Sequence, residues 1–246
     1  MATATTLPEQ QPQMSGIARA FGVLFNPTAT FEDIARKPSW IVPVVLLTIL
    51  SIGVGYLMSK KVDWPGFIRA QSEKSASFQQ LSEDQKQQRV EIGAKFAPAA
   101  AWGFAICGTI LLVMILTLIY WAAFNVLSGA QLRFSLPLGI VSHSFMPSLF
   151  AAILLIIVLS MKSFGDVNPN TMLASNLAAY LPGDSPNWMV SLGQSLDVFW
   201  FWTLILMALG FRAANPRKIK TGSAFGIVIG LWALYVLVKV GLSAAM

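Results

Sequence analysis

Residues 98–124 read PAAAWGFAICGTILLVMILTLIYWAAF, a run of 27 residues without a charged side chain. A helix that crosses the hydrocarbon core of a bilayer needs about 20 predominantly apolar residues. The run is continuous, whereas the strands of a membrane β-barrel alternate between apolar and polar residues. This stretch therefore predicts a transmembrane helix.

Four further apolar runs accompany it, and together they predict an all-α, polytopic membrane protein with five transmembrane helices. The chain is 55% hydrophobic and only 11% charged, against about 25% charged residues in a soluble domain. Such a composition excludes a soluble globular domain, and it equally excludes a disordered chain, which needs low hydrophobicity. The predicted spans of the 40–243 membrane domain are residues 40–58, 98–124, 138–161, 191–211 and 224–243.

The N-terminal region has a different pattern. Residues 1–15 are polar and predict a disordered tail. Residues 16–39 predict two short amphipathic helices, because Phe21 and Phe25 lie one helical turn apart on an apolar face. Trp40 follows, a residue type enriched at the membrane interface. We expect these helices to lie along the membrane surface, and the alternative is that they pack on the protein's own spans.

The most polar insertion is residues 59–97, in which seven basic residues are mixed with acidic ones. The tetrapeptide Ser82-Glu83-Asp84-Gln85 is typical of a capping box, and it predicts the start of a helix that runs to about Phe96. A surface of mixed charge is usually solvated. The insertion is therefore expected to form a solvated helical hairpin outside the bilayer.

The net charge of +6 does not indicate nucleic-acid binding here, because the basic residues flank apolar segments where lipid headgroups lie. Cys107 is the single cysteine and His143 the single histidine, which excludes an intramolecular disulfide and a Cys/His zinc cluster. No phosphate-binding loop or metalloprotease motif is present. We expect no cofactor, no metal and no nucleic acid among the ligands.

Orientation rests on the two last loops. Residues 212–223 carry four basic residues and no acidic one, whereas residues 162–190 carry a single basic residue. Because cytoplasmic loops are enriched in Lys and Arg, the 212–223 loop is expected in the cytoplasm. With five spans, the N-terminus is then cytoplasmic and the C-terminus lies on the other side.

Asp197 and Lys239 are the two charged residues inside the predicted spans. Asp197 lies about 9 Å from the start of the fourth span and Lys239 about 6 Å from the end of the fifth, at 1.5 Å per residue. Antiparallel neighbours would place both at a similar depth, so an interhelical ion pair is expected. The alternative is that Lys239 extends to the headgroups while Asp197 bonds to a nearby polar group. A proton or ion relay would need more than one such pair.

Gly222, Gly226 and Gly230 are spaced by four and share one face of the last predicted helix. Small residues at this spacing let another helix approach closely. The stripe therefore predicts close helix packing, either within the chain or through self-association.

His143 lies between two serines near the start of the third predicted span. Adjacent residues on a helix point in different directions, and no nucleophile elbow is present. We interpret His143 as a hydrogen-bonded interhelical residue, with Pro147 one turn later kinking the helix. No residue is assigned a catalytic role, and the chain is not expected to be an enzyme.

The segment Phe25-Asn26-Pro27, with Phe31, then Lys37-Pro38-Ser39-Trp40 and Pro43, resembles the start of the prokaryotic branch of the Yip (Ypt-interacting protein) domain family. The stretch Leu81 to Gln85 is similar to the first loop of that branch. The resemblance covers about residues 16–243 and implies a five-span helical protein with a cytosolic N-terminus, in a bacterial cytoplasmic membrane. Eukaryotic members are linked to prenylated GTPases, but their Asp-Leu-Tyr-Gly-Pro signature is missing, so GTPase binding is not predicted.

These observations favour a non-enzymatic membrane scaffold or membrane-organising protein. Its expected partners are the lipid bilayer and other membrane proteins, or a second copy of itself. The alternative is a small transporter or permeation protein, which would line its path with polar groups near the midplane.

Overall fold

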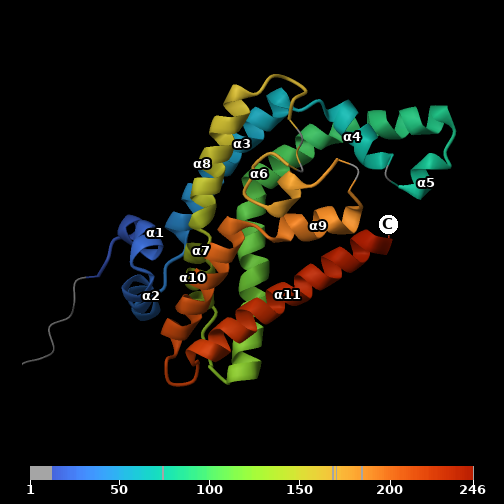
Figure 1. Ribbon diagram of the computed structural model, residues 1–246. Coiled ribbons are helices and arrows are strands. Elements are labelled where there is room, and N and C mark those ends of the chain that lie inside the picture. The colour runs from blue at the N-terminus through green and yellow to red at the C-terminus, as the bar shows by residue number, and fades with distance from the viewer. Residues whose placement is uncertain (1–12, 74, 168, 170, 184, 246) are drawn as a thin grey trace, which may run out of the picture.

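A computed structural model describes residues 13–245 apart from 74, 168, 170 and 184, and it is helical throughout, with no strand among those residues (Figure 1). Residues 1–12 of the predicted tail lie outside the described part. The elements are α1 (Gly16–Phe25), α2 (Pro27–Arg36), α3 (Ile41–Lys61), α4 (Trp64–Ser72), α5 (Ala76–Gln79), α6 (Glu83–Ser128), α7 (Ser135–Ser144), α8 (Pro147–Met161), the 3₁₀ turn η1 (Leu177–Tyr180), α9 (Asn187–Ser195), α10 (Val198–Ala214) and α11 (Thr221–Ala245).

Four helical segments are long and apolar enough to cross a membrane, and α10 is a shorter apolar helix of 17 residues. This arrangement confirms the predicted all-helical, polytopic membrane protein. The four long segments are Ile41–Lys61, Glu83–Ser128, Ser135–Met161 and Thr221–Ala244.

The longest helix, α6, joins the polar insertion to the second predicted span without a break over 46 residues. The predicted capping box forms: Ser82 Oγ accepts from the Gln85 amide and Gln85 Oε1 from the Ser82 amide. The expected end near Phe96 is wrong, because helix propagation is cooperative and Pro98 is tolerated where the helix packs on neighbours. Gly129, with φ of 56°, ends α6 in the left-handed region.

Two predicted spans are interrupted. The third is divided into α7 and α8 directly before Pro147, as its proline predicted. The fourth was expected as one helix but is divided at Leu196 and Asp197 into α9 and α10. The physical reason is the cap: the Asp197 carboxylate accepts from two backbone amides and so begins a new helix at that point.

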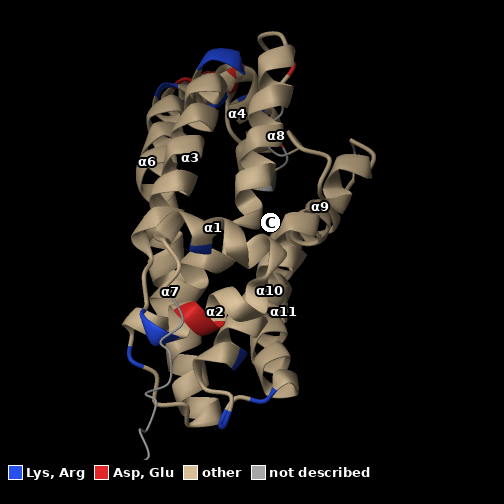
Figure 2. Cartoon of the chain, turned by 90° about the vertical axis from the view of Figure 1, so that its left-hand side faces the viewer, with Lys and Arg blue, Asp and Glu red and all other residues tan. Residues whose placement is uncertain are grey.

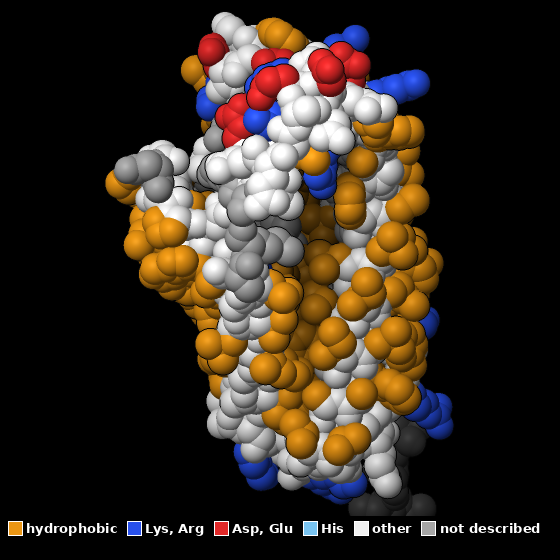
Figure 3. All heavy atoms as spheres, turned by 90° about the vertical axis from the view of Figure 1, so that its right-hand side faces the viewer, with side chains coloured by type: hydrophobic (Ala, Val, Ile, Leu, Met, Phe, Trp, Pro, Cys, Tyr) orange, Lys and Arg blue, Asp and Glu red, His pale blue; other side chains and the backbone are white. Residues whose placement is uncertain are grey.

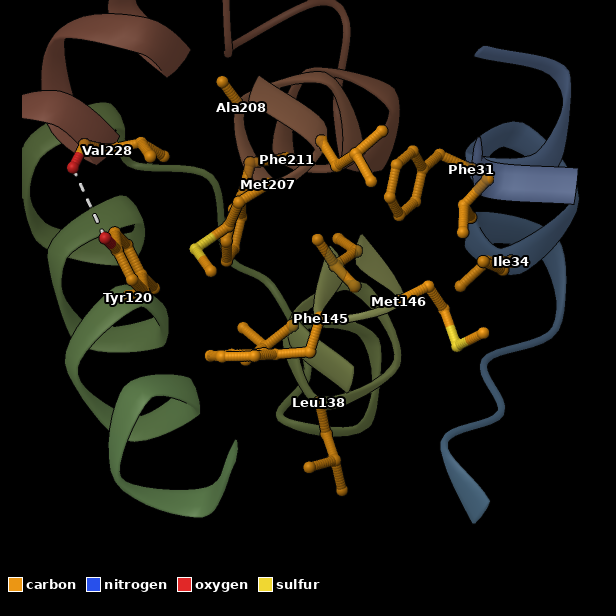
Figure 4. Packing of buried hydrophobic residues seen from close by; sticks show 14 of the residues in the cluster. Phe31, Ile34, Tyr120, Leu138, Phe145, Met146, Met207, Ala208, Phe211 and Val228 are labelled. Atoms are coloured by element: carbon orange, nitrogen blue, oxygen red, sulfur yellow. Dashed lines mark hydrogen bonds between the residues drawn. The ribbon is translucent and has the colours of Figure 1, made fainter. Parts of the chain in front are cut away.

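The core forms where α10 packs against α2, α7 and α11, and it continues into α3 packed between α6 and α8. Phe211 of α10 stacks on Phe124 of α6 with ring centroids 4.1 Å apart. Tyr120 donates to the Val228 carbonyl of α11 at 3.3 Å. Figure 4 shows Phe31 of α2 pointing into the same cluster, so the N-terminal helices contribute to the core.

Lys and Arg lie at both ends of the bundle (Figure 2). One end carries the α4–α6 insertion, and the other carries the loops beside α10 and α11. Between the ends the surface is apolar, with exposed side chains such as Phe104, Leu111 and Leu118 on α6. This is the surface that a lipid bilayer covers.

Candidate functional site

A buried ion pair joins α1 to α2. Arg19 Nε donates to Asp33 Oδ2 at 2.6 Å, and each side chain is only 4% exposed. The Arg19 guanidinium also donates to the Lys37 carbonyl at 2.8 Å and to Ser39 Oγ at 2.9 Å. These contacts satisfy the arginine on three sides and fix the chain where it enters α3.

The charge state of this pair follows from its contacts. Burial by itself raises the pKa of the Asp33 carboxyl, but the hydrogen bond and positive charge of Arg19, helped by Arg36, outweigh burial and hold the pKa below its ordinary value of 3.8. Asp33 is therefore ionised at neutral pH. The cluster is a permanent clamp between two helices, with both charges paired.

The clamp holds α1 and α2 on the spans at close approach. A Cβ at Gly139 of α7 would lie 3.0 Å from the Ser39 carbonyl oxygen, and one at Gly210 of α10 would lie 3.0 Å from the Phe31 ring. Glycine at these positions lets the elements approach that closely. The buried faces of α1 and α2 therefore pack on the protein's own spans, which was the alternative to a position along the membrane surface.

The opposite face of α1 points outward. Phe25 is 79% exposed and Phe21 is 41% exposed, while Trp40 is half-buried against the core. Contact of Phe21 and Phe25 with lipid stays a prediction. Arg19 was not among the residues predicted to be functional, although the sequence carries a signal for it: Arg19 lies four residues before Val23, on the same face of the helix.

The predicted pair of Asp197 and Lys239 is wrong. Asp197 caps α10 through Phe199 and Trp200, and its second carboxylate oxygen accepts a very short hydrogen bond from Ser175. Ser175, in the turn before η1, thus occupies the position beside Asp197 that was predicted for Lys239. The carboxylate faces backbone amides and a hydroxyl, which are strong partners inside a membrane protein.

Lys239 of α11 has different partners. Its ammonium donates to Gln194 Oε1 at 3.4 Å and to Ser195 Oγ at 3.3 Å, both on α9. Within the described residues neither group belongs to an ion pair. Asp197 and Lys239 therefore do not form a charge pair between α10 and α11 that could carry a proton or an ion.

His143 is completely buried, but its bond is not interhelical. Nδ1 lies 2.8 Å from the Gly139 carbonyl in the same helix, one turn earlier. Nε2 has no protein partner. The flanking hydroxyls of Ser142 and Ser144 likewise bond to carbonyls of α7. These three hydrogen bonds all stay within α7, so neither serine forms a nucleophile–base contact with His143.

Gly222, Gly226 and Gly230 lie on an open face of α11. A Cβ built at any of them would meet no atom within 4 Å. The predicted close packing within the chain is therefore wrong for this stripe. In contrast, a Cβ at Gly55 of α3 would lie 2.7 Å from Ala105 Cβ, so the small residue there does serve the α3–α6 contact.

The polar insertion forms a hollow of about 360 Å³, lined by charged side chains of α4 and α6 together with Phe78. Arg69 donates to Gln87 at 2.7 Å, and Lys86 pairs with Glu83 at 2.7 Å. One exposed ion pair and one bond to a neutral amide are typical of a solvated surface. In the part of the chain that the structure describes, no three His, Cys, Asp or Glu side chains gather to hold a metal.

Comparison with known proteins gives the family. The Yip1 domain model matches residues 21–242. The chain is also 25% identical over 209 residues to the membrane protein YknW of Bacillus subtilis strain 168, which covers 85% of this chain and 84% of that protein. No solved structure matches. The match begins within α1, includes α2 and continues almost to the end of α11, and the chain therefore belongs to the Yip1 domain family.

Proposed function

We propose that the protein is a non-enzymatic membrane scaffold that binds another membrane protein through α11. The observation that carries this proposal is the open stripe of Gly222, Gly226 and Gly230. Each glycine in a helix interior costs about 1 kcal/mol relative to alanine. No contact within the described chain offsets that cost, whereas a close-packed partner helix would.

Charge favours a different protein over a second copy. Arg217, Lys218 and Lys220 lie directly before α11, with no acidic residue between 212 and 223. In one membrane, two copies would meet in parallel and bring these cations together. Like charges within about one Debye length, roughly 10 Å, repel each other. The partner is therefore a membrane protein with small residues on its span and acidic residues at the same membrane face.

A transporter is less well supported. Its path would be lined by polar groups near the midplane. Lys239 instead lies near the end of α11 with uncharged partners, and Asp197 caps a helix. We place the protein in the bacterial cytoplasmic membrane with a cytoplasmic N-terminus, on the basis of the 212–223 loop.

The test is a substitution that blocks the stripe. Gly226→Leu should reduce co-purification of the partner in mild detergent by at least tenfold, while Gly103→Leu on α6, where a Cβ also meets nothing, should retain it. Gly226→Cys in a Cys107→Ala chain should form a cross-link to the partner's transmembrane segment. A cross-linked dimer of this chain, or equal recovery with Gly226→Leu, would contradict the proposal.

A further inference from the structure

A second membrane-level feature is an apolar cleft of about 310 Å³ between α3, α6 and α8. Its walls include Leu47 and Ser51 of α3, Thr109 of α6, and Ala151, Ala152 and Leu155 of α8. Leu173, in the loop before η1, lies at its edge. Figure 3 shows one face of the molecule, on which hydrophobic side chains cover the surface below the charged end and line a long hollow.

The cleft exists because α3 packs on both α6 and α8. Small side chains line the wall where α8 faces it, so the space is not filled from within. A membrane offers no water to fill an apolar space, so lipid is the available occupant.

The volume of the cleft fits an acyl chain better than a helix of a partner protein. A helix with side chains is about 10–12 Å across and rises 5.4 Å per turn, which corresponds to more than 400 Å³ for one turn. The cleft is smaller than that. At about 30 Å³ for a water-sized group, 310 Å³ holds roughly ten methylene groups.

Cations lie at the ends of α3 and α8, two of the three helices that form the cleft. Lys61 Nζ donates to the Lys162 carbonyl at 2.8 Å, and the Gly165 amide donates to the Lys61 carbonyl at 2.9 Å. These bonds hold the ends of α3 and α8 together, so Lys61 and Lys162 lie close to each other, and Lys60 precedes Lys61 in the last turn of α3. Among the described residues, none of the three forms an ion pair with a carboxylate.

The distance along α3 between the cleft and the cations matches the length of a lipid in one leaflet. Val54, at the upper wall, is seven residues from Lys61 and so about 10 Å away, and Leu47 is about 21 Å away. A single leaflet of the hydrocarbon core is about 15 Å thick. We propose that the cleft binds one acyl chain of an anionic phospholipid whose phosphate lies at Lys60, Lys61 and Lys162.

The experiment uses the full chain in detergent, mixed with phosphatidylglycerol or phosphatidylcholine, and measures bound lipid by native mass spectrometry. The wild-type protein should retain one phosphatidylglycerol. Ala152→Phe, which fills the cleft, should lower that fraction at least fivefold. Ala122→Phe, on an exposed position of α6, should not change it, and the two variants should share the same helical circular dichroism.

A third variant separates chain from headgroup. The double substitution Lys60→Gln with Lys162→Gln should lower the ratio of bound phosphatidylglycerol to bound phosphatidylcholine at least threefold. Ser148→Leu, which fills the same wall less than Ala152→Phe does, should weaken the binding of both lipids alike. Equal lipid retention by the wild type and both filled variants would overturn the proposal. So would a wild-type protein that carries no lipid, or a chain with Cys107→Ala and Ser148→Cys whose introduced thiol reacts only with water-soluble reagents.

Discussion

At the scale of single residues, paired charge is found where α1 meets α2, outside the predicted spans. Arg19 and Asp33 are each 4% exposed in their side chains and bond directly. Asp197 and Lys239 bond to uncharged groups instead. Desolvating a charge is costly, so each buried charge in this protein is met by hydrogen bonds from the nearest backbone or side chain.

Removing one partner of the clamp should be more harmful than removing both. Asp33→Asn leaves Arg19 without its counter-charge, and breaking a buried pair costs about 3–5 kcal/mol. Arg19→Met combined with Asp33→Leu should lose less, because no lone charge remains. Thermal unfolding in detergent, together with trypsin cleavage after Arg36, measures both variants. A loss below about 1 kcal/mol in Asp33→Asn would show that the clamp contributes little.

The clamp also predicts an acid response. The pKa of Asp33 is depressed in the folded protein, so its contribution to stability is complete above the ordinary value of 3.8 and is lost as the pH falls below it. Between pH 5 and pH 8 this contribution should stay constant. Trypsin is inactive in acid, so pepsin cleavage between pH 4.5 and pH 2.5 gives the readout. Asp33→Asn serves as the control and should lack the Asp33-dependent part of the change.

Asp197 and Lys239 should behave independently. Asp197→Ala removes a helix cap, which costs about 1 kcal/mol, while Asp197→Asn retains an amide oxygen that can still cap. Combination with Lys239→Met should be additive within about 0.5 kcal/mol, because the two side chains share no partner. A double-mutant cycle by thermal unfolding decides this. A coupling energy above about 1 kcal/mol would show that Asp197 and Lys239 interact directly, as in the predicted ion pair.

At the scale of elements, α1 shows how one helix serves two environments. Val23 is fully buried against the spans and Phe25, two residues later, is 79% exposed. Residues two apart on a helix face away from each other, so a single turn separates the core from the surroundings. The same contrast holds for α11, whose Ala224 and Val228 are buried while its glycines are open.

The exposed face of α1 should contact lipid. A spin label at Phe25 should show collisions with oxygen and with lipid-borne relaxation agents, whereas a label at Val23 should be immobile and protected. The reason is that Phe25 projects from the amphipathic face that the core leaves free. Power-saturation measurements in lipid bilayers distinguish the two sites. Full accessibility of Phe25 to water-soluble reagents would place α1 outside the membrane interface.

At the scale of the whole molecule, the chain passes back and forth between two charged ends. The α8 end and the loop after α10 lie at opposite ends of the bundle (Figure 1). The Yip1 family match covers this whole path, from residue 21 to residue 242. Both ends of the bundle carry basic residues (Figure 2), so the orientation prediction depends on the short 212–223 loop, in which the basic residues have no acidic neighbours.

Reporter fusions should place the two ends on opposite sides of the membrane. A fusion after Ser163 is expected outside the cytoplasm and a fusion after Lys218 inside it, because four basic residues gather in 212–223. Alkaline phosphatase and fluorescent-protein activities report the two sides. Cytoplasmic activity at Ser163 would reverse the orientation and move the lipid-binding cations to the inner leaflet.

The sequence by itself determined the membrane class, the helix start at Ser82 and the break at Pro147, but not the break at Asp197. Apolar length is a local property, and so are the capping box at Ser82 and the break at Pro147, because each depends on residues within a few turns. The tertiary structure alone decided that Arg19 meets Asp33, that Lys239 turns to α9, that the α11 glycines stay open and that α3, α6 and α8 leave a cleft. Those outcomes depend on how helices rotate and tilt against one another, and packing of the whole chain sets both.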